Sequence, residues 1–142
     1  MKNTITILFL FLFGACSLHG QFHFATGGQF NFDASALGAQ GKVFYEYDDT
    51  YRGSGTFTLH FDNVLNWTID LDGHYKLFTI SDDFNFAPLA GLAIINSSVE
   101  NTLALNLGVF LDKEINEKHF YLEPKLTFRN GTALIVSAGI FW

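Results

Sequence analysis

The side chains that could take part in chemistry are few, and they stand at alternate positions along apolar stretches. His60, Asp70, Asp72 and His74 are the clearest set, with His23 nearer the start of the chain. A histidine close to a carboxylate is a common pairing for general acid and base catalysis. However, no serine beside them has a recognisable nucleophile signature, and no metal-ligand spacing such as His-Glu-x-x-His or Cys-x-x-Cys occurs. We therefore expect hydrogen-bonded interior groups, with no catalytic residue, cofactor or metal site.

The elements that must position these residues are strands. Because successive side chains of a strand point to opposite faces, a strand with one apolar face shows apolar residues at every second position. Eight such runs follow one another, at about residues 22–32, 37–47, 53–61, 65–78, 84–95, 102–112, 119–128 and 132–142. Most have about the 9–11 residues that a tilted strand needs to cross a bilayer, and eight is the smallest even count among bacterial outer-membrane barrels. The pattern predicts an all-β, eight-stranded, antiparallel up-and-down transmembrane β-barrel.

The less apolar faces of these runs carry charges of both signs in equal number. Four acidic and four basic residues fall there, and with two histidines they form the predicted polar network of the lumen: Lys42, Glu46, His60, Asp70, Asp72, His74, Lys76, Glu123, Lys125 and Arg129. An eight-stranded barrel is just wide enough for side chains to fill, and buried charges need partners. The favoured interpretation is an internally paired polar plug, and a narrow path for ions or solutes is the alternative.

Composition agrees with a membrane barrel. Aromatic residues make up 17% of the chain and charged residues 15%, whereas soluble domains typically have about 25% charged residues. Most remaining charges, Arg52 and Asp112 among them, fall in the turns between the runs. The net charge of −6 makes nucleic acid an implausible partner.

The start of the chain has the layout of a secretory signal peptide. A short basic start is followed by an apolar run from Ile5 to Phe13 and then by small residues. This run is too short to span a membrane as a helix. We expect residues 1–20 to be removed by cleavage after Gly20, which leaves 21–142 as the barrel domain; cleavage after Ser17 is the alternative. Cys16 lies either inside the removed segment or in a loose lipobox, where it would be lipidated.

The last run is the expected closing strand. Its more apolar face carries Leu134, Val136, Ala138, Ile140 and Trp142, whereas the other face is mostly small. A terminal aromatic preceded by apolar residues at every second position resembles the signal by which the barrel-assembly machinery recognises its clients.

Two local features constrain the strand assignment. The hairpin before the closing strand needs a three-residue loop, 129–131, because only an odd loop puts Leu126 and Leu134 on the same face. Pro88 and Pro124 lie within runs, and a proline cannot donate to a sheet ladder. Each proline should therefore mark a bulge or a missing ladder bond.

Several segments resemble small porin-family proteins common in Bacteroidetes-type bacteria. They are the strand Phe86–Leu92, the stretch Leu105–Gly108 with the polar turn after it, the strand Leu122–Phe128 and the closing strand Ala133–Trp142. OmpX-like and OmpA-like eight-stranded barrels are similar families. The resemblance covers essentially all of residues 21–142 and implies fold and compartment, but hardly any activity. The chain departs from the pattern in ending on tryptophan, where phenylalanine is usual, and in its short loops.

We therefore expect an integral outer-membrane barrel of structural or porin-like role, without enzyme activity, exported by a cleaved signal peptide and with both ends in the periplasm. Its partners would be outer-membrane lipids and, during biogenesis, the barrel-assembly machinery; we expect a monomer. Two alternatives remain. Because alternation does not say which face is inside, the chain could be a secreted or periplasmic lipocalin-like barrel that binds an apolar ligand. A lipid-modifying outer-membrane enzyme is the other, although exposed serine and histidine pairs are lacking.

Overall fold

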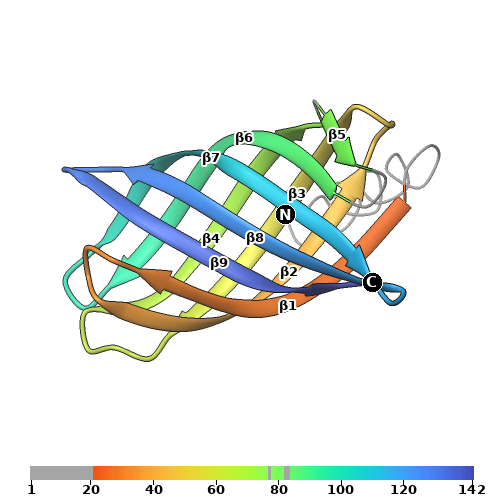
Figure 1. The fold of residues 1–142 in the computed structure, drawn as a ribbon. Helices are drawn as coiled ribbons and strands as arrows, with labels where there is room; N and C mark the ends of the chain where they lie inside the picture. Colours follow the sequence, from red (N-terminus) through yellow and green to blue (C-terminus); the bar gives the residue numbers. More distant parts are fainter. Residues whose placement is uncertain (1–20, 77, 82–83) are drawn as a thin grey trace, which may run out of the picture.

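The computed structural model describes residues 21–76, 78–81 and 84–142, and Figure 1 shows the fold. The expected signal peptide lies outside these residues, as do Cys16 and both candidate cleavage sites. The described residues form strands, turns and bends. In this part of the chain there is no helix long and apolar enough to cross a membrane.

Nine strands follow one another along the described chain. They are β1 (Gln21–Asn31), β2 (Ala36–Glu46), β3 (Tyr51–His60), β4 (Leu65–Tyr75), β5 (Phe78–Ser81), β6 (Phe84–Ser97), β7 (Asn101–Ile115), β8 (Lys118–Phe128) and β9 (Thr132–Phe141). Each predicted run corresponds to one strand, except that the run at 65–78 ends in the structure at Tyr75 and a separate four-residue strand, β5, follows.

The strands form one closed antiparallel sheet. Their order is β4-β3-β2-β1-β9-β8-β7-β6-β5, and β4 also pairs with β6. The pairing of β4 with β6 closes the ring, while β5 pairs with β6 beyond the end of β4, so that β4 and β5 share one position in an eight-stranded wall. β1 and β9 lie side by side, which brings the two ends of the described chain together at one end of the barrel (Figure 1). The predicted eight-stranded up-and-down barrel is confirmed.

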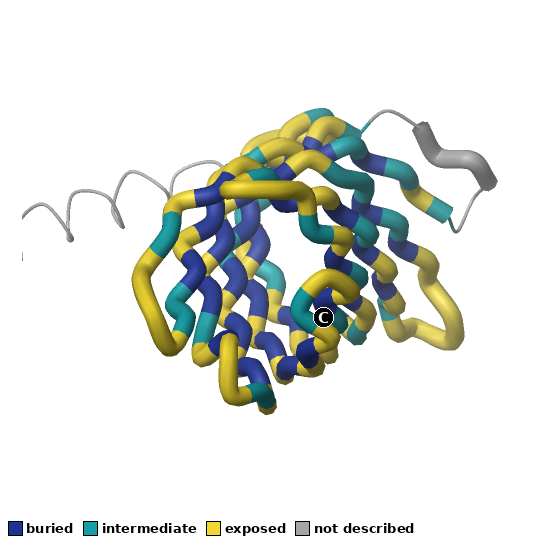
Figure 2. Tube along the Cα trace, turned by 90° about the vertical axis from the view of Figure 1, so that its left-hand side faces the viewer, coloured by how far each residue is buried: buried dark blue, intermediate teal, exposed yellow. Residues whose placement is uncertain are grey.

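Side chains alternate between the two faces of this wall. Figure 2 looks into the barrel from the end opposite the chain termini and shows buried and exposed residues alternating along the strands. In β2, for example, Gly38, Gln40, Lys42 and Phe44 are buried, and the residues between them are exposed. The charged face of the predicted runs is therefore the inner face, and the apolar face is the outer one.

One predicted face assignment, at the start of β4, is wrong. Leu65 is buried and Asn66 is exposed, although the alternation places Leu65 on the outer face. The pairing of β4 with β6 shifts its register between Leu65 and Trp67. Such a shift adds one residue to one strand, so the alternation that holds from Trp67 onward is inverted before it.

The predicted loop length before the closing strand is confirmed. Leu126 pairs with Leu134, and Phe128 pairs with Thr132, as a three-residue loop requires. An even loop would have shifted the register by one residue and turned the apolar face of β9 inward.

The two prolines lie where the ladder is interrupted, as predicted. The pairing of β4 with β6 ends at Leu89 and that of β5 with β6 begins at Phe86, so Pro88 falls between the two. Pro124 falls in a gap of the pairing between β7 and β8. Proline has no N–H to donate to a ladder. Because the pairing is interrupted at both places, the strands accommodate proline there without losing a ladder hydrogen bond.

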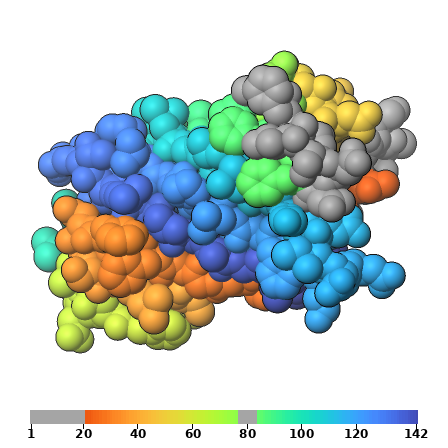
Figure 3. All heavy atoms as spheres, in the orientation of Figure 1, coloured from red at the N-terminus to blue at the C-terminus, as the bar shows by residue number. Residues whose placement is uncertain are grey.

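The outer surface is a belt of large apolar side chains. Every strand longer than four residues contributes exposed Phe, Leu, Ile, Val or Tyr side chains to it. Figure 3 shows side chains of β1, β8 and β9 forming one continuous outer surface over the seam between β1 and β9. Monomeric soluble proteins rarely expose contiguous apolar patches beyond a few hundred Å², so this exterior suits hydrocarbon better than water.

Candidate functional site inside the barrel

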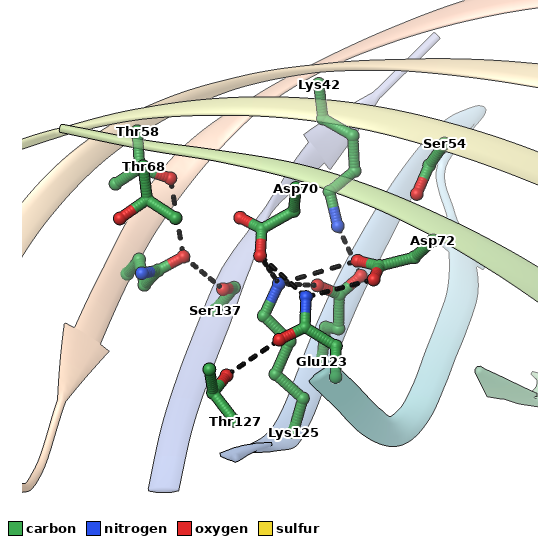
Figure 4. A network of polar contacts seen from close by, with 12 residues as sticks. Lys42, Ser54, Thr58, Thr68, Asp70, Asp72, Glu123, Lys125, Thr127 and Ser137 are labelled. Atoms are coloured by element: carbon green, nitrogen blue, oxygen red, sulfur yellow. Dashed lines mark hydrogen bonds and ion pairs between the residues drawn. The ribbon is translucent and has the colours of Figure 1, made fainter. Parts of the chain in front are cut away.

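The middle of the interior holds one ammonium group among three carboxylates. Lys125 Nζ, from β8, lies 2.9 Å from Asp70 Oδ1, 3.5 Å from Asp72 Oδ2 and 3.6 Å from Glu123 Oε1. All four side chains are essentially inaccessible to solvent. Figure 4 shows Lys125 and the two aspartates of β4 pointing toward one another. Lys125 therefore links two strands, β8 and β4, that are not neighbours in the wall.

A second buried ion pair balances part of this negative charge. Lys42 Nζ, from β2, donates to Glu123 Oε2, and both side chains are fully buried. Removing charges from water costs several kcal/mol per ion, and only well-placed partners offset that cost. Glu123 has such partners on both sides, since it lies between Lys42 and Lys125.

An amide also donates to both aspartates. Asn106 Nδ2, from β7, donates to Asp70 Oδ1 at 2.7 Å and to Asp72 Oδ1 at 3.0 Å. Asn106 Oδ1 accepts from Thr127 Oγ1 at 2.8 Å. We call this group the central cluster: Lys42, Asp70, Asp72, Asn106, Glu123 and Lys125. It joins β2, β4, β7 and β8 across the lumen, and five of its six members, all but Asn106, belong to the predicted polar network.

A layer of aromatic rings lies between the central cluster and the end of the barrel near the chain termini. The ring centroid of Phe44 is 5.3 Å from that of Phe110 and 5.6 Å from that of Phe141. Tyr121 stacks on Phe110 with a centroid distance of 5.4 Å. These spacings are those of favourable aromatic pairs. The four residues, here called the aromatic layer, come from β2, β7, β8 and β9.

Arg52 lies against this layer. Its Cζ atom is 4.6 Å from the ring centroid of Phe44 and 4.3 Å from that of Phe110, within the range of cation–π interactions. Its Nη1 atom is 3.7 Å from Glu46 Oε1, the oxygen that accepts a 2.9 Å hydrogen bond from Lys76 Nζ. Glu46 and Lys76 are thus partners at the rim, whereas the guanidinium of Arg52 is buried below them.

His60 and His74 have hydroxyl partners rather than carboxylate partners. His60 Nε2 is 3.0 Å from Thr68 Oγ1 instead of an aspartate of β4, and His74 Nε2 is 2.8 Å from Ser54 Oγ. A serine next to a histidine can be an activated nucleophile, but His74 Nδ1 has no hydrogen-bond partner to orient the ring, and both side chains of this pair are buried. Among the described residues, no group of three or more His, Cys, Asp or Glu could hold a metal ion.

The prediction from the sequence is wrong for three charged residues. Arg129 is exposed in the turn after β8 instead of contributing to the lumen network, because β8 ends at Phe128. Conversely, Arg52 and Asp112 are buried inside, although the predicted turns include them. β3 begins at Tyr51 and β7 continues to Ile115, so both residues belong to strands. Extending the alternation outward from Ser54 and from Phe110 would have placed both on the inner face.

Neither a protein-family model nor a curated protein matches the sequence. The structure is similar to the N-terminal β-barrel domain of Pseudomonas aeruginosa OprF, with a TM-score of 0.72 and 18% identity over 87% of this chain and 98% of that one. It is also similar to a de novo designed transmembrane β-barrel, with a TM-score of 0.62 and 13% identity over 87% and 95%. A third similar structure is that of Ail, the attachment invasion locus protein of Yersinia pestis, in complex with the heparin analogue sucrose octasulfate. Its TM-score is 0.52 and its sequence identity 13%, over 88% of this chain and 100% of that one.

The closed wall and these comparisons define the class of protein. The chain has the fold of the eight-stranded transmembrane β-barrels, as its resemblance to small porin-family and OmpA-like barrels implies. At identities of 13–18%, the likeness concerns the fold. The Bacteroidetes-type origin stays a prediction.

Proposed function

We propose that this protein is an integral outer-membrane β-barrel with a structural role and a lumen closed to solutes. One observation carries the proposal: charged side chains are buried inside, and large apolar side chains cover the outside. In water this arrangement would be strongly unfavourable, whereas in a bilayer it exposes the apolar belt to hydrocarbon. The chain termini would face the periplasm.

The proposed partners follow from the same outer face. Bilayer lipids contact the belt, and the barrel forms without needing a second copy of the chain. The residues of the expected assembly signal support recognition by the barrel-assembly machinery, because Leu134, Ala138 and Ile140 are exposed on the outside and Val136 is half-buried. Trp142, which follows β9, is exposed at the end of the barrel. An enzymatic role has no support in the geometry, since the Ser54–His74 pair is buried inside the barrel.

The closed lumen rests on two barriers in series. The central cluster joins four strands across the middle, and the aromatic layer lies between it and the terminal end. Toward the opposite end, the cavity beneath the turns has a volume of about 20 Å³, roughly the space of one water molecule. A hydrated ion would have to displace buried ion pairs to pass.

A lipocalin-like carrier is disfavoured by the same interior. Such a barrel holds its apolar ligand in an apolar cavity, but the inner face here carries Lys42, Asp70, Glu123 and Lys125 at its centre. These charges are already paired with one another inside the barrel. An apolar ligand would have to separate them, which would leave them buried and unpaired.

Membrane location is the first expected result. The protein should sediment with the outer membrane, require detergent for extraction and run faster on a gel when unheated than when boiled, because a closed barrel resists unfolding in detergent. Fractionation followed by paired unheated and boiled lanes measures all three. Recovery of the protein in the detergent-free periplasmic fraction would contradict the proposal.

Absence of conductance is the second expected result. The purified protein in a planar bilayer should give no discrete current steps above those of protein-free bilayers, while a general porin in the same apparatus gives them. Insertion must be shown in parallel, by the heat-dependent gel shift of protein recovered from lipid vesicles. Reproducible unitary steps from inserted protein would show that the lumen is an ion path.

A further inference from the structure

The barrel end near the chain termini opens into a cavity that the proposed role does not use. Its volume is about 480 Å³, within the range of roughly 300–1,000 Å³ for small-molecule sites. We call it the vestibule. It lies on the outer side of the aromatic layer, and the residues that matter for its chemistry are His119, Glu46, Arg52, Lys76, Asp112 and Glu117.

One side of the vestibule carries excess positive charge. Arg52 and Lys76 come from the β3 and β4 side of the wall, with Glu46 of β2 between them. Glu46 Oε1 is closer to Lys76 Nζ, at 2.9 Å, than to Arg52 Nη1, at 3.7 Å. The Nε and Nη2 atoms of Arg52 have no hydrogen-bond partner, although the residue is only 4% exposed. A guanidinium has five donors, so Arg52 lacks acceptors.

The opposite side carries negative charge. Asp112 of β7 and Glu117 of the following turn both line the vestibule, and β7 and β8 stand across the ring from β3. Asn85 Nδ2 donates to Asp112 Oδ2 at 2.9 Å, which fixes this carboxylate at the wall. The guanidinium of Arg52 reaches toward this side, because its Cζ atom lies 4.3 Å from the ring centroid of Phe110, also on β7. His119 stacks on Phe141 with a centroid distance of 4.8 Å, and its Nδ1 atom has no hydrogen-bond partner.

We propose that the vestibule binds a small zwitterion, namely a free amino acid with an apolar side chain. Its carboxylate lies against Arg52 and supplies the missing acceptor, and its ammonium group lies toward Asp112 and Glu117. Phe141 and Trp142, which also line the cavity, contact the apolar side chain. A simple anion would meet repulsion from the acidic side, and a simple cation would leave Arg52 without an acceptor, so charge complementarity favours a ligand with both groups.

The test compares three ligands of similar shape on the same detergent-solubilised protein. L-Leucine carries both charged groups, 4-methylpentanoate only the carboxylate, and isopentylamine only the ammonium. The chain has two tryptophans, of which Trp142 lines the vestibule and Trp67 lies in β4 near the other end. Leucine should shift the indole N–H resonance of Trp142 saturably and leave that of Trp67 unchanged. It should bind about tenfold more tightly than either half-ligand, because each half loses one charge-assisted contact.

Matched variants separate the site from general charge effects. Arg52→Gln and Asp112→Asn should each weaken leucine binding about tenfold or more. Arg129→Gln and Asp33→Asn change the same residue types at the opposite end of the barrel, and binding should stay as in the unaltered protein. The heat-dependent gel shift shows which variants fold. If Arg52→Gln and Asp112→Asn both fail to fold, the comparison of the three ligands on the unaltered protein decides.

Three outcomes would overturn the proposal. In the first, no ligand shifts the Trp142 resonance saturably. In the second, 4-methylpentanoate binds as tightly as leucine. In the third, the Arg52→Gln variant folds and binds leucine normally. The second would assign a plain anion site instead. None of them bears on membrane location or on the closed lumen, which the fractionation and conductance experiments test separately.

Discussion

Replacing Lys125 with methionine is expected to lower the free energy of unfolding by about 3–5 kcal/mol, as removal of one partner from a buried ion pair does. Methionine keeps most of the apolar stem, so the loss reports the ammonium group. Without it, Asp70, Asp72 and Glu123 stay buried, with Lys42 Nζ on one oxygen of Glu123 and Asn106 on the aspartates.

Urea unfolding of the protein in lipid vesicles, followed by the gel shift between compact and unfolded forms, measures this loss. Lys118→Met is the matched control, because Lys118 is exposed at the start of β8 and should change the stability by no more than about 0.5 kcal/mol. Combining Lys125→Met with Asp70→Asn should restore part of the lost stability, since one uncompensated carboxylate is removed. Similar losses for the Lys125 and Lys118 variants would contradict a buried ionic cluster.

The inner and outer faces could be predicted because alternation is a local property of each strand. Lys42, Asp70 and Lys125 are placed inside by counting residues from apolar neighbours, without any knowledge of the other strands. The same counting fails at Leu65, where a bulge in the pairing with β6 adds a residue. Nothing in the order of residues 65–67 marks that bulge.

The contacts within the lumen could not be predicted in the same way. Lys125 of β8 contacts Asp70 and Asp72 of β4. This contact depends on the height of each residue along the barrel axis and on the diameter of the barrel, and both are set by the register of all the strands together. Alternation gives a side chain's face but not its height or its direction within the lumen. Equal numbers of charges indicated pairing but not the partners.

The ends of strands were the weakest part of the prediction, and this affected the site. Arg52 and Asp112 follow the alternation of β3 and β7, but polar residues near a turn signal gave turns that were too long. The vestibule was therefore not predicted, because Arg52 and Asp112 were assigned to turns and only Glu46 and Lys76 of its charges were placed in the lumen. Strands of a closed barrel continue past the apolar belt, and their last inward residues can be fully buried while their outward neighbours are exposed.

A methyl group added at Gly139 is expected to prevent normal closure of the barrel. A Cβ atom there would lie 2.1 Å from the carbonyl oxygen of Thr26, 2.8 Å from the Cα atom of Gly27 and 2.8 Å from a ring carbon of Tyr121. Two of these atoms belong to the backbone of β1, and Gly27 is the direct partner of Gly139 at the seam. Relief requires β1 and β9 to separate, and a closed barrel has no free edge that could absorb the shift.

Gly139→Ala should therefore lose more than the roughly 1–3 kcal/mol that overpacking usually costs, and much of the protein should lack the compact unheated form. Gly41→Ala is the control, because a Cβ atom on Gly41, on the outer face of β2, meets no atom within 4 Å. Alanine restricts the unfolded chain more than glycine does, so this control should match or exceed the original stability. The two variants differ only in where the methyl group points, so equal behaviour would mean that the seam between β1 and β9 is not the tight contact described here. A large loss confined to Gly139→Ala would show that closure depends on glycine at this seam, and that the ends of the chain are held by backbone packing as well as by the ladder.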